Sequence, residues 1–172
     1  MAVFYKTSGP SPFIIFGPPG TGKTVTLVET CLQLLAYKAG STLLLTAPSN
    51  AAADLLCECL APHVDPASRM LRLIAPSRMK TDVSPTVKRF SHEVMGFFAC
   101  PELTELRKFR VVISTMISAS ILGGVGLEKG HFSHIFVDEV RSFSFLPPRL
   151  SFHSPFSFPF LSPPSTLRFL PT

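Results

Sequence analysis

Residues 17–24 decide the fold, and they read Gly17-Pro18-Pro19-Gly20-Thr21-Gly22-Lys23-Thr24, a complete G-x-x-x-x-G-K-T pattern. An apolar run at residues 13–16 predicts a strand before the pattern, and an apolar periodicity predicts a helix over about residues 22–37 after it. Glycines in such a turn let the backbone curve around phosphate oxygens, and the helix start behind them adds the positive end of its dipole. The sequence therefore predicts a nucleotide-binding P-loop.

Lys23 and Thr24 have side chains suited to direct roles at this turn. The Lys23 ammonium is expected to reach the β and γ phosphates of ATP and to act in catalysis, and the Thr24 hydroxyl is expected to bind Mg²⁺. ATP and Mg²⁺ are therefore the predicted cofactors. A glycine turn with a purely structural role is the alternative interpretation.

A second chemical signal is the acidic pair Asp138-Glu139, which directly follows an apolar run. Residues 134–138 predict a buried strand, and open α/β sheets bind ligands at the carboxyl ends of their strands. We expect Asp138 to hold Mg²⁺, directly or through water, and Glu139 to orient or deprotonate the attacking water. A solvated surface turn is the alternative for such a pair.

A third signal is the turn Ala47-Pro48-Ser49-Asn50, which follows a predicted strand at residues 42–46. Ser49 or Asn50 can cap a helix that runs to about Leu60. The start of a capped helix offers amide hydrogens and hydroxyls to a passing phosphate. An ordinary helix cap without a ligand is the alternative.

The order of elements predicts an α/β fold, with a parallel sheet flanked by helices. Residues 110–115 form a further predicted buried strand, residues 71–74 a short apolar run, and residues 101–108 a candidate helix. A glycine-rich segment separates the strands at residues 110–115 and 134–138.

The composition fits one domain better than a two-domain motor or a membrane protein. The chain has 172 residues, of which 46% are hydrophobic and 16% are charged. No apolar run reaches the roughly 18 residues of a membrane span, and the amino terminus lacks the order of a signal peptide, so we predict a soluble intracellular protein. Four cysteines without C-x-x-C spacing are predicted to be buried thiols: Cys31, Cys57, Cys59 and Cys100.

Residues 141–172 differ in composition from residues 1–140. In this tail 26 of 32 residues are Phe, Ser, Pro or Leu, and seven prolines forbid helix interiors. Three of the basic residues lie there, so the formal charge of +5 for the whole chain leaves 13 basic and 11 acidic residues, or +2, in residues 1–140. We predict a disordered low-complexity tail and hypothesise that it derives from a retained intron or a frameshifted exon.

Five stretches between residues 12 and 139 carry a family resemblance: GPPGTGKTVTLVET, LLLTAPSNAAADLLCECL, LRLIAPSR, RVVISTMISAS and HFSHIFVDE. They resemble the RNA helicases of the nonsense-mediated-decay and RNA-silencing branch of superfamily 1, the DNA2/NAM7-like family. The resemblance implies a partial RecA-like ATP-binding domain in residues 1–140, ATP-driven movement on single-stranded RNA with unwinding, a role in RNA silencing and a cytoplasmic location. Single-stranded DNA stays open as an alternative strand. The implied nucleic-acid contacts are Pro48, Ser49, Asn50, Ser114 and Thr115.

The sequence departs from the family pattern at both ends of the resemblance. A glutamine that would read adenine is missing before the P-loop, and Val140-Arg141 stand where the family continues with Ala or Gly and Gln. By this resemblance, the motif III strand, the second RecA-like domain and its arginines are expected to be missing, and the sheet is expected to be incomplete. We therefore expect this fragment to be inactive or very slow and only marginally stable, with a non-enzymatic nucleotide- or RNA-binding product as the alternative. An AAA ring subunit is a third class, which the A-P-S-N turn argues against.

Two further groups of residues can be explained by structural roles, without a ligand. His131 and His134 lie three residues apart, but no cysteine or carboxylate accompanies them at ligand spacing, so packing roles are favoured. Six basic residues form a loose cluster that would either approach RNA phosphates or lie scattered in solvent: Arg69, Arg72, Arg78, Lys80, Lys88 and Arg89.

Overall fold

The computed structural model describes residues 15, 17–18, 20–64 and 69–138. The strand predicted at residues 13–16, apart from Ile15, lies outside the described residues, as do Pro19, Glu139 and the tail at residues 141–172. The predicted domain division at residue 140 therefore stays a prediction.

A four-stranded sheet forms the centre of the described chain, in the order β2-β5-β1-β6. Its strands are β1 (Leu43–Ala47), β2 (Met70–Arg72), β5 (Val111–Thr115) and β6 (His134–Val137). All three pairings are parallel. Every residue of β1 and β5 is buried, which explains why these strands read as continuous apolar runs.

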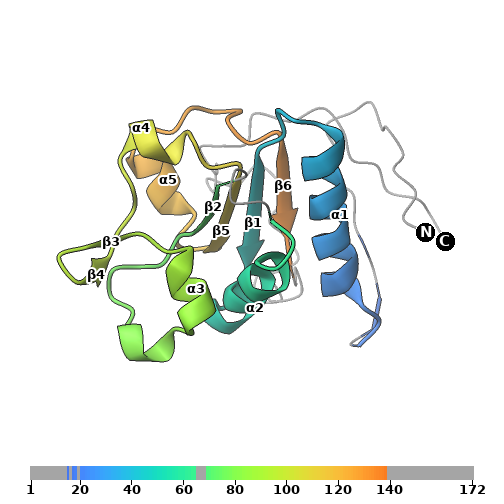
Figure 1. The fold of residues 1–172 in the computed structure, drawn as a ribbon, viewed down its shortest axis with the longest axis horizontal. Helices are drawn as coiled ribbons and strands as arrows, with labels where there is room; N and C mark the ends of the chain where they lie inside the picture. The colour runs from blue at the N-terminus through green and yellow to red at the C-terminus, as the bar shows by residue number, and fades with distance from the viewer. Residues whose placement is uncertain (1–14, 16, 19, 65–68, 139–172) are drawn as a thin grey trace, which may run out of the picture.

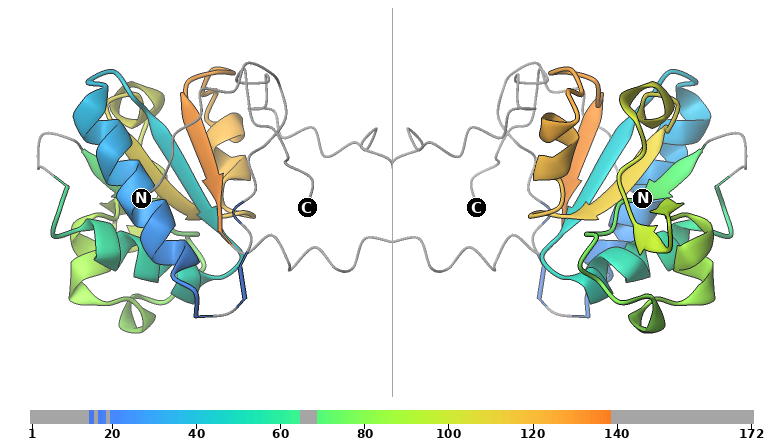
Figure 2. Two further views of the ribbon diagram at one scale, coloured as in Figure 1. Left: turned by 90° about the vertical axis from the view of Figure 1, so that its right-hand side faces the viewer. Right: turned by 90° about the vertical axis from the view of Figure 1, so that its left-hand side faces the viewer.

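Helices cover both faces of this sheet (Figure 1). The longer ones are α1 (Lys23–Tyr37) and α2 (Asn50–Leu60), and they share one apolar core with the short α3 (Pro85–Arg89). The short helices α4 (Leu103–Leu106) and α5 (Ser120–Gly124) belong to a second core. Figure 2 shows α1 (blue) and α5 (light orange) on opposite sides of the strands. The predicted α/β fold with a parallel sheet flanked by helices is confirmed.

Alternation along the central strand β1 explains how one sheet supports two cores. Leu43 and Leu45 pack into the core beneath α1 and α2, whereas Leu44 packs into the core beneath α4 and α5. Cys31 and Cys57 are buried in the first of these cores, and burial raises the pKa of both thiols to about 12. These two cysteines match the predicted buried thiols, while Cys59 and Cys100 are only half-buried.

The boundaries of the main elements lie close to the predicted ones. The helix predicted at residues 22–37 begins one residue later, and the strand predicted at residues 42–46 is shifted by one. The helix predicted at residues 101–108 is shorter, because Lys108 and Phe109 donate backbone bonds to residues three positions back and tighten the chain before β5. A 3₁₀ turn at Lys80–Asp82 and a hairpin of β3 (Glu93–Val94) and β4 (Phe97–Phe98) were not predicted.

Candidate nucleotide and nucleic-acid site

The carboxyl ends of three parallel strands meet at one edge of the sheet. Ala47, the last residue of β1, is in register with Thr115 of β5, and Thr46 is in register with Val137 of β6. The first turn of α1 lies at the same end of the molecule as the arrowheads of β1 and β6 (Figure 1). The fold therefore brings the P-loop, the Pro48-Ser49-Asn50 turn and Asp138 to one edge, as expected for an open α/β sheet.

Two glycines give the P-loop its curvature. Gly20 has φ +80° and Gly22 has φ +82°, both in the left-handed region that side-chain-bearing residues rarely adopt. Gly22 is the N-cap of α1, and its carbonyl accepts the first helical bond from Thr26 N at 2.9 Å. The Thr21 hydroxyl donates to the Pro18 carbonyl at 2.8 Å across the turn. The loop is thus a closed turn joined directly to the helix start.

The Lys23 ammonium folds back onto this loop. Its Nζ donates to the carbonyl oxygens of Gly17 and Pro18, at 2.8 Å each. These bonds keep the positive charge on the inside of the glycine-rich turn. Because an ammonium has three N–H donors, phosphate oxygens can replace the carbonyls as acceptors without a change of helix position.

A backbone hydrogen bond to β1 holds Asp138 at the end of β6. Its amide donates to the Thr46 carbonyl at 2.8 Å, which continues the ladder between β1 and β6 by one residue, and the residue is only 9% exposed. Thr24, the second residue of α1, is half-buried.

The donor set at this edge fits Mg²⁺. A hydroxyl and a carboxylate are hard oxygen ligands, which Mg²⁺ prefers together with water and substrate phosphates. The described residues hold no group of three or more His, Cys, Asp or Glu side chains that could form a closed metal site. The assignment of Thr24 and Asp138 as Mg²⁺ ligands stays a prediction from the sequence.

Ser49 caps α2, which settles the choice that the sequence left open. Its backbone is extended, and its Oγ accepts a hydrogen bond from Ala52 N at 3.2 Å. Asn50 is the first helical residue, and both side chains are exposed at the sheet edge. Pro48 is half-buried in the turn that leads to them.

The end of β5 presents less side-chain surface than expected. Ser114 is fully buried, and its Oγ has no hydrogen-bond partner among the described residues. Thr115 is 9% exposed, and its Oγ1 accepts from Ser118 N at 3.1 Å and lies 2.9 Å from the Ser118 hydroxyl. In this arrangement Ser114 has no exposed surface with which to contact a nucleic acid.

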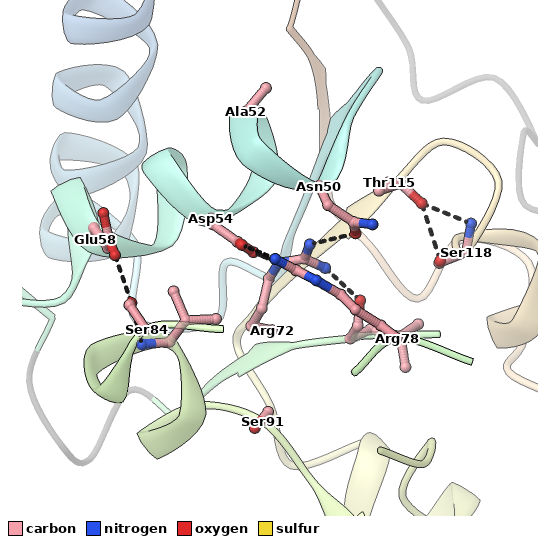
Figure 3. A network of polar contacts seen from close by, with 12 residues as sticks. Asn50, Ala52, Asp54, Glu58, Arg72, Arg78, Ser84, Ser91, Thr115 and Ser118 are labelled. Carbon is pink, nitrogen blue, oxygen red and sulfur yellow. Dashed lines mark hydrogen bonds and ion pairs between the residues drawn. The ribbon is translucent and has the colours of Figure 1, made fainter. Parts of the chain in front are cut away.

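The loose basic cluster is not a single exposed surface. Arg72 is fully buried and pairs with Asp54, which also pairs with Arg78 (Figure 3). Lys80 forms an ion pair with Glu93. Neither of the two interpretations of the sequence holds for Arg72, because its charge is neutralised inside the protein.

The two histidines lie at the opposite, amino-terminal edge of the sheet. His134 begins β6 in register with Leu43, and the His131 carbonyl accepts from the Thr42 hydroxyl at 2.6 Å. Burial lowers the pKa of both rings, assisted by Arg107 at His131 and by Lys38 at His134, while Glu128 opposes the shift at His131. Both rings are thus held near the neutral form by packing.

Comparisons with known proteins place the chain in a family. A family model described as an AAA domain matches residues 2–96. "Putative helicase mov-10-B.1" from Danio rerio is 44% identical over 138 residues, which cover 77% of this chain and 13% of that protein. "RNA helicase Mov10l1" from Homo sapiens is 39% identical over 132 residues, which cover 76% of this chain and 10% of that protein. The chain thus spans a small part of the length of these relatives.

No solved structure matches the chain. Among the described residues, no helix is long and apolar enough to cross a membrane.

Proposed function

Since the chain belongs to the DNA2/NAM7-like family of superfamily 1 helicases, we propose that residues 1–140 form the nucleotide-binding part of an ATP-dependent RNA helicase. The observation that carries this proposal is the meeting of the P-loop, the Asp138 strand end and the Ser49 cap at one edge of the sheet. Folds alone do not assign function, but this arrangement has the groups that a nucleotide and a phosphate backbone require.

The P-loop would bind the triphosphate of ATP. The glycine turn and the first turn of α1 supply backbone amides, and Lys23 exchanges the carbonyls of Gly17 and Pro18 for phosphate oxygens. Mg²⁺, when bound by Thr24 and Asp138, would offset negative charge on the phosphates. Glu139, which follows Asp138 in the sequence, is proposed to orient the attacking water.

The exposed turn after β1 would bind single-stranded RNA, with DNA as the competing strand in a binding assay. Ser49 and Asn50 present polar groups at the start of α2, and Pro48 and Thr115 belong to the same edge. Phosphate contacts of this kind position a strand without reading its sequence.

A short backbone path connects the two proposed ligands. Thr46 accepts the amide of Asp138 and lies three residues before the Ser49 cap. We propose that a shift of Asp138 upon nucleotide binding is transmitted through this hydrogen bond to the turn that is proposed to hold RNA.

The test is Mg²⁺-dependent ATP binding and hydrolysis by the full chain, with and without single-stranded RNA, against a Lys23→Ala variant. We expect Lys23→Ala to weaken ATP binding at least about tenfold, because it removes the ammonium that is proposed to donate to phosphate oxygens in place of the loop carbonyls. RNA-stimulated turnover that is lost in the variant would establish an active motor fragment. Saturable ATP binding without turnover would support the non-enzymatic alternative, and absence of ATP binding by folded protein would overturn the proposal.

A cytoplasmic location and a role in RNA silencing are proposed from the family alone. Fluorescence imaging of a tagged chain checks the first, and a nuclear or membrane pattern would contradict it. Recovery of bound RNA after crosslinking in cells checks the second.

A further inference from the structure

Arg72 is the largest side chain that is fully buried in the described part of the protein. Burial of a guanidinium is unfavourable unless its donors are satisfied, and Arg72 satisfies them in three directions. Nε donates to Asp54 Oδ1 at 2.9 Å, Nη1 donates to the Leu73 carbonyl at 2.5 Å, and Nη2 donates to Asn50 Oδ1 at 3.1 Å. Two of these partners lie on α2 and one lies beside Arg72 on the chain.

Asp54 does not depend on Arg72 alone for its counter-charge. Arg78 donates to both of its carboxylate oxygens, at 3.1 Å to Oδ1 and 2.6 Å to Oδ2, and also donates to the Asp82 carbonyl at 2.9 Å. The two arginines therefore both hold α2, Arg72 against β2 and Arg78 against the segment that follows β2. Only Arg72 extends further, to the exposed Asn50 (Figure 3).

The contact with Arg72 fixes which way the Asn50 amide faces. A guanidinium has donors and no acceptors, so the amide oxygen must face Arg72 and the amide nitrogen must face away. Figure 3 shows the Asn50 nitrogen turned away from the guanidinium. Two N–H donors are thus presented outward at the start of α2.

Ser49 adds a third donor beside them. Its Oγ accepts the Ala52 amide at 3.2 Å, so its own hydrogen is directed elsewhere. Phosphate oxygens and ribose hydroxyls accept such bonds, and amides and hydroxyls supply many of the backbone contacts in nucleic-acid complexes.

We propose that Arg72 is a positioning residue, which holds the Asn50 amide with its N–H donors toward the RNA backbone. This inference rests on the proposed function, because it assumes that the Ser49-Asn50 turn binds RNA. A lysine at position 72 keeps a positive charge for Asp54 but lacks the planar fork that reaches Asn50 at the same time. The arginine is therefore required for its shape as well as for its charge.

The experiment compares four variants of the full chain by fluorescence anisotropy with a labelled oligouridylate. We expect Arg72→Lys and Asn50→Ala each to weaken RNA binding about 5- to 10-fold, as for the loss of one well-placed hydrogen bond. The double variant should lose no more than either single one, because both changes remove the same contact. Arg78→Lys is the matched control, since Arg78 shares Asp54 but does not touch Asn50, and we expect it to stay within about twofold of wild type.

A fifth variant keeps the test independent of folding. Asn50→Asp preserves the acceptor for Arg72, removes the outward N–H donors and adds a negative charge that repels phosphate, so it should fold as wild type does and bind RNA at least about tenfold more weakly. The side-chain amide signal of Asn50 in a ¹⁵N NMR spectrum gives a direct readout. It should shift in Arg72→Lys, remain in place in Arg78→Lys, and respond to RNA in the wild type.

The outcomes separate this inference from the proposed function. If the wild type binds RNA and Asn50→Asp or folded Arg72→Lys binds as tightly, the positioning role is overturned while the proposed function stands. Additive losses in the double variant would also overturn it. If the wild type binds ATP but not RNA, the RNA part of the proposed function fails, and the positioning role is overturned with it.

Discussion

Gly22 combines two structural demands at one residue. Its φ of +82° lies in the left-handed region, and it is also the residue from which α1 begins. A side chain in that region crowds the following carbonyl, so alanine would either be strained or would rotate the amides that face the proposed phosphate site. We predict that Gly22→Ala lowers the free energy of unfolding by about 1 kcal/mol and weakens ATP binding, measured by urea denaturation and nucleotide titration.

Gly124 provides the matched comparison for Gly22. It lies in α5 outside the positive-φ region, and an added methyl group would meet nothing within 4 Å. Gly124→Ala should therefore leave ATP binding unchanged and stabilise the protein by up to about 1 kcal/mol. Equal effects of the two substitutions would contradict the conformational argument.

At the scale of elements, Arg110 joins the carboxyl end of α1 to the start of β5. Its Nη2 donates to the carbonyls of Leu35 and Lys38 at 3.2 and 3.1 Å, and its Nε donates to the Ser41 carbonyl at 3.2 Å. A cation at this end also interacts favourably with the negative end of the helix dipole. Arg110→Ala should lower the free energy of unfolding by about 2 kcal/mol in urea denaturation.

Arg107 is the control for Arg110, because it lies three residues away and forms an ion pair instead of contacts with backbone carbonyls. It pairs with Glu128 at 2.5 Å, and both side chains are exposed. Exposed pairs contribute little, so Arg107→Ala should change stability by less than about 0.5 kcal/mol. A comparable loss in both variants would contradict the argument that the three backbone contacts of Arg110 account for its larger effect.

Sequence patterns predicted the long elements well and the short ones poorly. α1, α2, β1 and β5 are long or fully buried, so their periodicity follows directly from burial. α5 ends in Gly123-Gly124, residues that disfavour helix, and it depends on the packing of Leu122 into the second core. Its tertiary contacts override its local propensity. The Ser84-Pro85 start of α3, by contrast, carried a cap signal that could have been recognised.

In the candidate site, too, features made of neighbouring residues could be predicted from the sequence, and contacts between distant residues could not. The P-loop is contiguous in sequence, and the glycine conformations that it requires are present at Gly20 and Gly22. The contact of Arg72 with Asn50 joins residues 22 positions apart on two elements. Nothing in the spacing of basic residues distinguishes a buried arginine from an exposed one, so only the fold revealed it.

At the scale of the molecule, the two edges of the sheet hold different groups of residues. Lys23 and Asp138 lie at the carboxyl edge, whereas His131 and His134 lie at the amino edge. Substitutions at the amino edge should therefore affect folding without reaching the proposed nucleotide site. The half-buried histidines offer a way to test this separation by pH.

Acid should destabilise the fold through these two rings. Burial holds the pKa of His131 and His134 below the ordinary value of 6.5, with Arg107 and Lys38 acting in the same direction and Glu128 opposing at His131. As the pH falls through 6.5, the unfolded chain binds protons on these rings before the folded chain does. The free energy of unfolding should therefore be largest above pH 6.5 and should fall between about pH 7 and pH 5.

Urea denaturation at several pH values, with the double variant His131→Gln and His134→Gln, measures this effect. The variant should show a flatter dependence over the same range, because it removes the groups that titrate there. Its ATP affinity at neutral pH should equal that of the wild type, since both substitutions lie at the edge opposite Lys23. An unchanged slope would show that other groups control the acid response, and a loss of ATP affinity in folded protein would show that the two edges of the sheet are coupled.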